Sequence, residues 1–213
     1  MTGCCCQGIE DQFNRRVATA ELERYRRTGP RETTRLLLDA LRACGIDGLT
    51  LLDIGGGVGA IQHELLRAGV VRAESVEASA AYLAATREEA ARQGHADRHT
   101  ARHGDFVALA AEIPPADIVT LDRVICCYRD MPTLVTASVA RARQLYGLVY
   151  PRDTWWVRAG IAAENLLFRL RRTPFRTFAY AAAAVEAIVR DHGFERRAIH
   201  RTFVWQVVVY ARP

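Results

Sequence analysis

Residues 49–67 constrain the fold of this chain more than any other stretch. The apolar run at 49–54 has the length of a buried β-strand, and residues 61–67 have the apolar spacing of a helix. Between them lie four glycines, namely Gly55, Gly56, Gly57 and Gly59. A strand, a glycine turn and a helix in this order are typical of a nucleotide-binding unit, because glycine lets backbone amides approach a ligand closely.

Asp53 stands at the end of this strand, just before the glycines. A dinucleotide would place its pyrophosphate over the turn, where a carboxylate would repel it, whereas a ligand with an ammonium group would be attracted. S-adenosylmethionine (SAM) carries an ammonium and a sulfonium and has no phosphate. Asp53 therefore favours SAM over a dinucleotide as the ligand of this turn. The glycines also fit the dinucleotide fingerprint, so an NAD-linked oxidoreductase stays open as an alternative.

The length and charge of the chain narrow its function further. A chain of 213 residues suits one domain with a full core. All 29 basic residues are arginine, which excludes chemistry that needs a lysine, such as a pyridoxal Schiff base or a P-loop. The net charge of +5 is spread along the chain, so we expect no nucleic-acid partner.

The six cysteines indicate a reduced, cytoplasmic protein, because neighbouring cysteines make poor disulfide frameworks and no secretory signal precedes them. They occur as Cys4–Cys6, Cys44 and Cys126–Cys127. Adjacent cysteines fit no zinc site, and we expect no metal. A non-catalytic protein that binds SAM, or a metal through its thiols, is a further alternative to an enzyme. No apolar run spans a membrane, so we expect no membrane partner.

Apolar patterning predicts an alternation of strands and helices after two N-terminal helices. The two helices are expected at 11–27 and 31–44, and strands at 49–54, 71–76, 98–102, 117–122 and 145–150. Further helices are expected at 61–67, 80–93, 107–112, 134–143, 155–172 and 181–191. Two late runs at 198–204 and 206–210 suit an antiparallel pair. This order predicts an α/β fold with a parallel sheet covered by helices on both faces.

The pattern Asp53-x-Gly55-x-Gly57-x-Gly59, with acids at later strand ends, resembles the class I SAM-dependent methyltransferase superfamily over about residues 46–213. The resemblance implies a Rossmann-like three-layer sandwich with a mostly parallel seven-stranded sheet and an antiparallel last strand. We expect a single domain over residues 1–213. Within it, residues 1–45 form a helical N-terminal lid, and a helical cap is inserted at about 153–176.

The resemblance also implies the cofactor contacts. Glu77, at the end of the second strand, would accept hydrogen bonds from both ribose hydroxyls, as a carboxylate can. Ala78 would flank the adenine, Asp105 would accept from its amino group, and Phe106 would supply an amide and an apolar wall. Each residue alone could equally be a turn or cap residue; the signal is their joint order at the carboxyl edge of the sheet.

A narrower resemblance is to the magnesium-protoporphyrin O-methyltransferase branch. It rests on Gln12-Phe13-Asn14, on Tyr25 in an arginine-rich helix, and on residues 121–128, Leu-Asp-Arg-Val-Ile-Cys-Cys-Tyr. That branch has Leu-Asp-x-x-Ile-His-Tyr after the fourth strand. Here the histidine is absent and two cysteines stand in its place, one residue longer. We therefore keep the broader implication of a small-molecule O-methyltransferase with an N-terminal lid.

The acceptor end offers several candidate residues. A hydroxyl or carboxylate acceptor can need a base, and Asp122, Tyr128 and Tyr25 are the candidates. Arg152 and the pair Trp155–Trp156 follow the fifth strand and suit a flat, anionic small-molecule substrate, although two tryptophans can equally pack a cap onto the sheet. The oligomeric state is expected to be a monomer or a homodimer.

Overall fold

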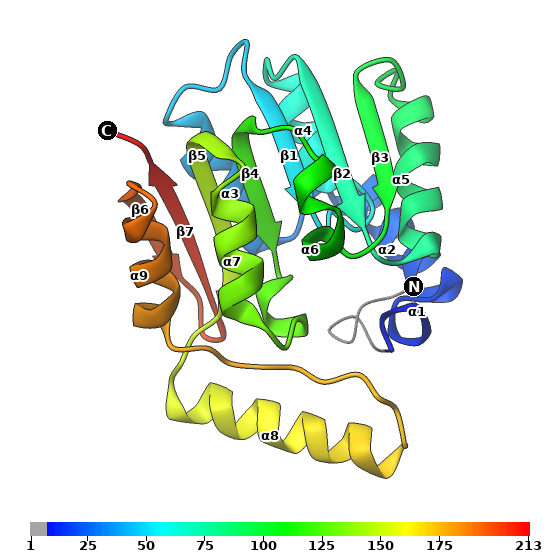
Figure 1. The fold of residues 1–213 in the computed structure, drawn as a ribbon. Coiled ribbons are helices and arrows are strands. Elements are labelled where there is room, and N and C mark those ends of the chain that lie inside the picture. Colours follow the sequence, from blue (N-terminus) through cyan, green and yellow to red (C-terminus); the bar gives the residue numbers. More distant parts are fainter. Residues whose placement is uncertain (1–7) are drawn as a thin grey trace.

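A computed structural model describes residues 8–213, in which seven strands form one sheet. The strands are β1 (Thr50–Ile54), β2 (Arg72–Glu77), β3 (His99–His103), β4 (Ala116–Asp122), β5 (Ala142–Pro151), β6 (Glu195–Arg201) and β7 (Trp205–Ala211). Their order is β3-β2-β1-β4-β5-β7-β6, and β1 to β5 pair in parallel (Figure 1). β7 is antiparallel to both β5 and β6, which confirms the expected topology.

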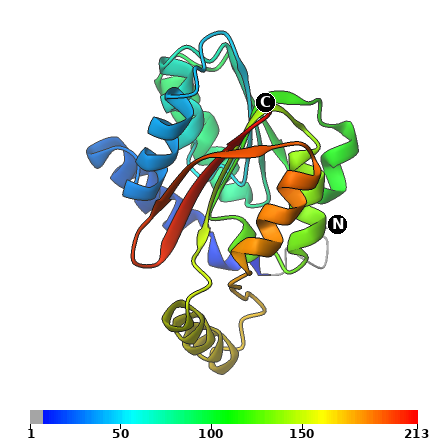
Figure 2. The same cartoon turned by 90° about the vertical axis from the view of Figure 1, so that its left-hand side faces the viewer.

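Helices cover both faces of the sheet, as expected for a three-layer sandwich (Figures 1 and 2). One face carries α3 (Glu32–Arg42), α4 (Ala60–Arg67) and α5 (Ala80–Arg92). The other carries α6 (Phe106–Leu109), α7 (Met131–Val139) and α9 (Ala182–Asp191). Because β1 and β4 have helices on both sides, their residues are almost all buried.

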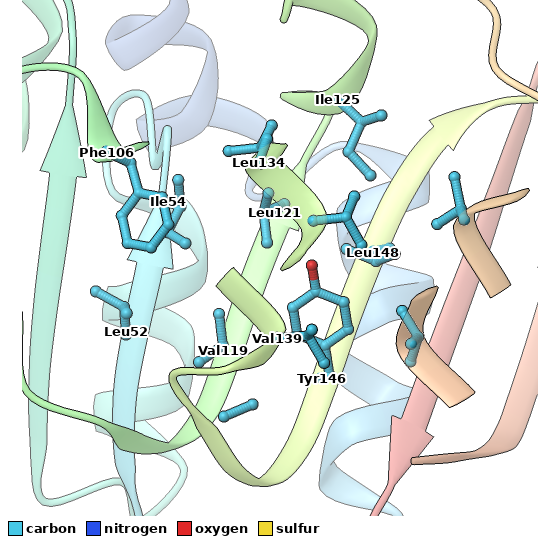
Figure 3. Packing of buried hydrophobic residues seen from close by; sticks show 14 of the residues in the cluster. Leu52, Ile54, Phe106, Val119, Leu121, Ile125, Leu134, Val139, Tyr146 and Leu148 are labelled. Atoms are coloured by element: carbon cyan, nitrogen blue, oxygen red, sulfur yellow. The ribbon is translucent and has the colours of Figure 1, made fainter. Parts of the chain in front are cut away.

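The larger part of the core lies between the sheet and the helices α6, α7 and α9. Figure 3 shows side chains from β1, β4 and β5 meeting those of α6 and α7 there. Tyr146 is fully buried in this layer, and its hydroxyl lies 2.6 Å from the Ser138 hydroxyl, so the polar atom has a partner. This packed layer supports β1, β4 and β5, whose carboxyl ends lie at one edge of the sheet.

The N-terminal segment contains two helices before α3, where one was expected at 11–27. They are α1 (Ile9–Gln12) and α2 (Arg15–Thr28). The expected single helix is wrong because Asn14 has extended backbone angles and caps α2, its Oδ1 accepting from the amides of Arg16 and Val17. α2 packs on α5 through Leu22 and Tyr82, so the segment covers the carboxyl edge of the sheet.

The boundary between α7 and β5 also differs from expectation. The sequence predicted a helix at 134–143, but α7 starts at Met131 and ends at Val139. Asp130 caps it by accepting from the amide of Thr133, which begins the helix earlier. The Arg141 carbonyl instead accepts a hydrogen bond from the Ala116 amide at the start of β4. The residues after Arg141 therefore pair with β4 and form β5.

Helix α8 (Trp155–Leu170) stands off from the sheet between β5 and α9 (Figures 1 and 2). It lies within the cap expected at 153–176. The segment that follows α8 runs back along the helix, where the Asn165 side chain forms hydrogen bonds with the backbone of Thr177. The Phe178 amide then donates to the Cys126 carbonyl. Among residues 8–213, no helix combines the length and apolarity needed to cross a bilayer.

Candidate active site

The glycine turn after β1 forms one wall of a large cavity at the carboxyl edge of the sheet. Gly55, Gly57 and Gly59 all have positive φ, the region that favours glycine. A Cβ on Gly55 would also lie 2.5 Å from Val124 Cγ2. The turn therefore requires glycine both for its backbone angles and for the close approach of the loop after β4.

Asp53 lies behind this turn and does not line the cavity. Its carboxylate is fully buried and accepts from Thr120 Oγ1 at 2.7 Å and from Gln62 Nε2 at 2.8 Å. Burial raises the pKa of Asp53 to about 7, although the bond from Thr120 opposes this rise. The structure thus ties Asp53 to β4 and α4, so that it braces the glycine turn instead of facing the ligand as the sequence suggested.

Glu77 ends β2 and faces the cavity. Its Oε2 accepts from the Gly57 amide at 3.0 Å and its Oε1 from the Ser79 amide at 2.9 Å. Burial raises the pKa of Glu77, and these backbone bonds oppose the rise. Each oxygen keeps a further lone pair, so the carboxylate can hold a diol while it holds the turn. Ala78 lines the cavity next to it.

Asp105, Phe106 and Tyr128 form the next part of the wall. Asp105 caps α6 by accepting from the Val107 amide, and the Tyr128 hydroxyl donates to the two oxygens of Asp105 at 3.2 and 3.3 Å. The sequence had placed Tyr128 among the candidate bases at the acceptor end. The structure pairs it with the carboxylate that the resemblance assigns to the adenine.

Asp122 ends β4 and lines the cavity. Its Oδ2 accepts from Thr34 Oγ1 of α3 at 2.5 Å, and its Oδ1 accepts from Arg123 Nε at 3.0 Å. Arg123 has a φ of 60°, a backbone conformation that is costly for a residue with a side chain. Asp122 therefore joins α3 to the end of β4, and it lies at the strand end where the sequence placed it.

Tyr25 does not reach the cavity, which makes its place as a candidate base wrong. It is buried between α2 and α5, and its hydroxyl donates to Glu64 of α4 at 3.2 Å. Burial raises the pKa of Tyr25 to about 12. The cavity-facing side of α2 instead carries Val17, Glu21 and Arg24, at spacings of four and three residues. Tyr25 follows Arg24 by one residue and so points about 100° away around the helix.

Several residues of α2 and α3 that line this cavity were not predicted from the sequence. Glu21 accepts from the Tyr82 hydroxyl at 2.5 Å and pairs with Arg31 at 3.0 Å. Arg24 and Thr34 line the same wall. The spacing of Val17, Glu21 and Arg24 places them on one side of the helix, and this pattern could have identified them. Tyr25, the residue that was chosen, lies on a different side.

Cys126 and Cys127 line the cavity in a short turn after β4. Their sulfurs lie 3.7 Å apart, and both thiols point to the Arg123 carbonyl. The hydrogen bond between Cys126 and Cys127, together with burial, raises the pKa of the Cys126 thiol well above its usual value, which disfavours the reactive thiolate. Within residues 8–213 no cluster of side chains could hold a metal ion; Cys4–Cys6 lie outside the described part.

The cavity has a volume of about 900 Å³, near the upper end of the range for small-molecule sites, roughly 300–1,000 Å³. Its far walls come from α8 and from the turn between β6 and β7. Trp156 and Phe203 stack there, with ring centroids 5.9 Å apart and planes 22° from parallel. Arg152 lies 5.5 Å from the Trp156 ring. The same cavity therefore joins the glycine turn to an aromatic compartment.

These features fit SAM. The acid at the end of β2 is buried and still has acceptor capacity, the glycine turn beside it lines the cavity and has backbone angles that favour glycine, and the cavity extends beyond both. The neighbouring compartment provides room for an acceptor beside the cofactor. Asp53 is shielded from the cavity, and its partners are Gln62 and Thr120.

Solved structures share this fold. A magnesium protoporphyrin IX methyltransferase from Synechocystis with bound S-adenosylhomocysteine (SAH) is 18% identical, with a TM-score of 0.72 over 96% of this chain and 98% of that one. An O-methyltransferase family protein from Burkholderia thailandensis is 13% identical, with a TM-score of 0.72 over 97% of this chain and 63% of that one.

An O-methyltransferase family 2 protein from Planctomyces limnophilus, solved with apigenin, is 16% identical, with a TM-score of 0.62 over 87% of this chain and 63% of that one. At such identities the likeness establishes the fold. No curated protein sequence matches the chain.

A family model described as the O-methyltransferase domain matches residues 7–145, which is more than half of the chain and includes the glycine turn, Glu77, Asp105 and Asp122. The chain belongs to the O-methyltransferase domain family and is a SAM-dependent methyltransferase.

Proposed function

We propose that this enzyme transfers the methyl group of SAM to an oxygen of a small, planar, anionic acceptor. SAM would lie along the glycine turn with its ribose on Glu77 and its adenine between Ala78, Asp105 and Phe106. The cofactor supplies an electrophilic methyl group. The acceptor would then occupy the compartment bounded by Asp122, α2 and α8.

The observation that carries the anionic character is a group of arginines on the cavity wall. Arg24, Arg31 and Arg123 all line it. Arg31 and Arg123 pair with Glu21 and Asp122, respectively.

Within residues 8–213, by contrast, the buried Nε of Arg24 has no hydrogen-bond partner. Burial and repulsion from Arg31 and Arg123 lower the pKa of Arg24. An acceptor anion would satisfy the free donor and relieve the repulsion.

The planar character rests on the aromatic compartment. Trp156 and Phe203 present stacked rings, and Phe175, Val157 and Ile161 add apolar surface to the same cavity. A flat ring system gains area and stacking against such walls. The Synechocystis enzyme is named for magnesium protoporphyrin IX and the Planctomyces limnophilus protein was solved with apigenin, and both are flat ring systems.

The chain's own contribution to transfer is alignment and exclusion of water. The lid helices and α8 enclose the acceptor compartment, and Asp122 stands at its strand edge, held by Thr34 and Arg123. An acceptor hydroxyl at this place would lose its proton to Asp122 or to water, whereas a carboxylate would need no base.

The test is methyl transfer from labelled SAM to matched pairs of acceptors. Each pair contains a hydroxylated aromatic carboxylate and its neutral carboxamide. We expect the carboxylate to be preferred. Arg24→Gln should raise its KM about tenfold to a hundredfold, the value of one lost charge-assisted bond.

The control is Arg16→Gln on the same helix, an exposed residue that does not line the cavity. It should change the KM less than twofold. Equal turnover of the two members of each pair, or no response to Arg24→Gln, would refute the anionic acceptor.

A further inference from the structure

Helix α8 carries an apolar stripe on the side that faces away from the protein. The stripe is defined by Trp155, Ala159, Ala162, Leu166 and Leu170, spaced at four, three, four and four residues, and all five are exposed. Trp155 is 77% exposed, Leu166 57% and Leu170 71%. The residues that α8 buries, Val157 and Phe168, lie on the opposite side. A helix facing only water should present polar residues there.

Basic residues flank this stripe. Arg158 and Arg169 lie along one edge, and Arg171 and Arg172 follow the helix end. None of these four forms an ion pair with any side chain in residues 8–213. The single acid of the helix, Glu164, lines the cavity on the inner side and accepts from the Thr177 hydroxyl. The outer surface of α8 is therefore apolar and purely cationic.

The position of α8 leaves this surface free. Figures 1 and 2 show the helix lying apart from the sheet and its covering helices, with its outer side turned away from them. Aromatic contacts connect the stripe to the cavity: Trp155 contacts the edge of Trp156, and Trp156 stacks on Phe203. The inner side of the same helix thus bounds the cavity while its outer side faces solvent.

We infer that the outer surface of α8 docks in the plane of an anionic lipid bilayer. An exposed apolar stripe that includes a tryptophan and is edged by arginines is the pattern of helices that lie in the interface of a membrane. Anionic headgroups supply the counter-charge that the four unpaired arginines lack. A second copy of this chain would not supply this counter-charge, since its own α8 surface carries arginines and no carboxylate. Docking would hold the cavity at the lipid surface without any spanning segment.

The test is co-sedimentation of the full chain with vesicles, and it involves no acceptor or turnover. Vesicles of phosphatidylcholine and phosphatidylglycerol in equal parts should bind the protein, and binding should fall as salt rises. Vesicles of phosphatidylcholine alone should bind it at least tenfold more weakly.

Two sets of variants locate the surface. Leu166→Gln with Leu170→Gln should abolish binding to the mixed vesicles. Arg169→Gln with Arg171→Gln should weaken it about twenty-fivefold, at roughly fivefold for each charge near an anionic surface. The matched control is Arg190→Gln with Arg197→Gln, which removes two exposed arginines elsewhere. SAH binding should be unchanged in all of them, which shows that each variant is folded.

Three results would overturn the inference. The first is no binding of the native chain to the mixed vesicles. The second is an equal loss of binding in the control variant. The third is a dimer in solution that the Leu166→Gln, Leu170→Gln variant dissociates while vesicles bind neither form, because the stripe would then be a contact between copies. Failure of the proposed acceptor chemistry would leave each of these readouts unaffected.

Discussion

Replacing Glu77 by glutamine tests the cofactor site where the geometry is most explicit. The two carboxylate oxygens of Glu77 already accept from the amides of Gly57 and Ser79, at 3.0 and 2.9 Å. Glutamine has the same shape but turns one oxygen into an NH₂ group. That group would face a backbone donor, so one bond to the turn is lost, together with one acceptor for the ribose.

The magnitude follows from those losses. A hydrogen bond to a charged group contributes about 1.5–3 kcal/mol, and a buried donor left without a partner costs about 1–3 kcal/mol. The bond to the turn is lost both with and without ligand, so the ribose bond dominates the change in affinity. We expect the Kd for SAH to rise about tenfold to a hundredfold.

Calorimetry with SAH measures the effect, and Glu74→Gln is the matched control. Glu74 lies on the same strand, pairs with Arg102 and does not line the cavity. Its replacement should leave the Kd within twofold, because surface pairs contribute little. If Glu77→Gln binds SAH as tightly as the native protein, Glu77 does not hold the ribose and the site is misassigned.

Three further predictions concern His63, a buried histidine of α4, and two parts of the site. Burial lowers the pKa of His63 to about 3 and that of the neighbouring His99 to about 4, so the stability contributed by neutral His63 is complete above its usual pKa of 6.5 and is lost as pH falls toward 3. The loss of stability between about pH 7.5 and pH 5 should therefore be about 2 kcal/mol smaller in His63→Gln than in the native protein, and equal losses in the two would contradict this. Gly55→Ala should weaken SAH binding and lower the free energy of unfolding by about 1–3 kcal/mol, because the new Cβ would lie 2.5 Å from Val124 Cγ2. Adding Val124→Ala should restore part of the lost stability; no rescue would show that backbone strain alone is responsible. Tyr128→Phe removes a hydrogen bond to Asp105 and should raise the Kd for SAH about fivefold, with kcat nearly unchanged. A hundredfold fall in kcat would instead indicate that Tyr128 acts in catalysis.

The sequence was sufficient to predict the elements whose pattern is set locally. The first strand, observed at Thr50–Ile54, and the glycine turn lie where the periodicity placed them, and Glu77 and Asp122 end their strands as expected. These features depend on buried runs and turn residues, which a sequence shows directly. The antiparallel pair at the end of the chain was predicted for the same reason.

Orientations that depend on packing were not predictable in the same way. A break of the first helix at Asn14 sets the rotation of α2, and it decides that Arg24 faces the cavity while Tyr25 faces Glu64. The shielding of Asp53 depends on Gln62 and Thr120, which come from separate elements. No short window of sequence contains such a contact.

The cofactor of this enzyme is tested most directly by a pair of calorimetric titrations of the native protein, one with SAH and one with reduced NAD. We expect saturable binding of one SAH per chain and no binding of the dinucleotide, because the chain belongs to the SAM-dependent methyltransferases and the Gly57 amide, a donor that a pyrophosphate would need, is already bonded to the carboxylate of Glu77. Binding of the dinucleotide in place of SAH, or binding of neither, would contradict this expectation.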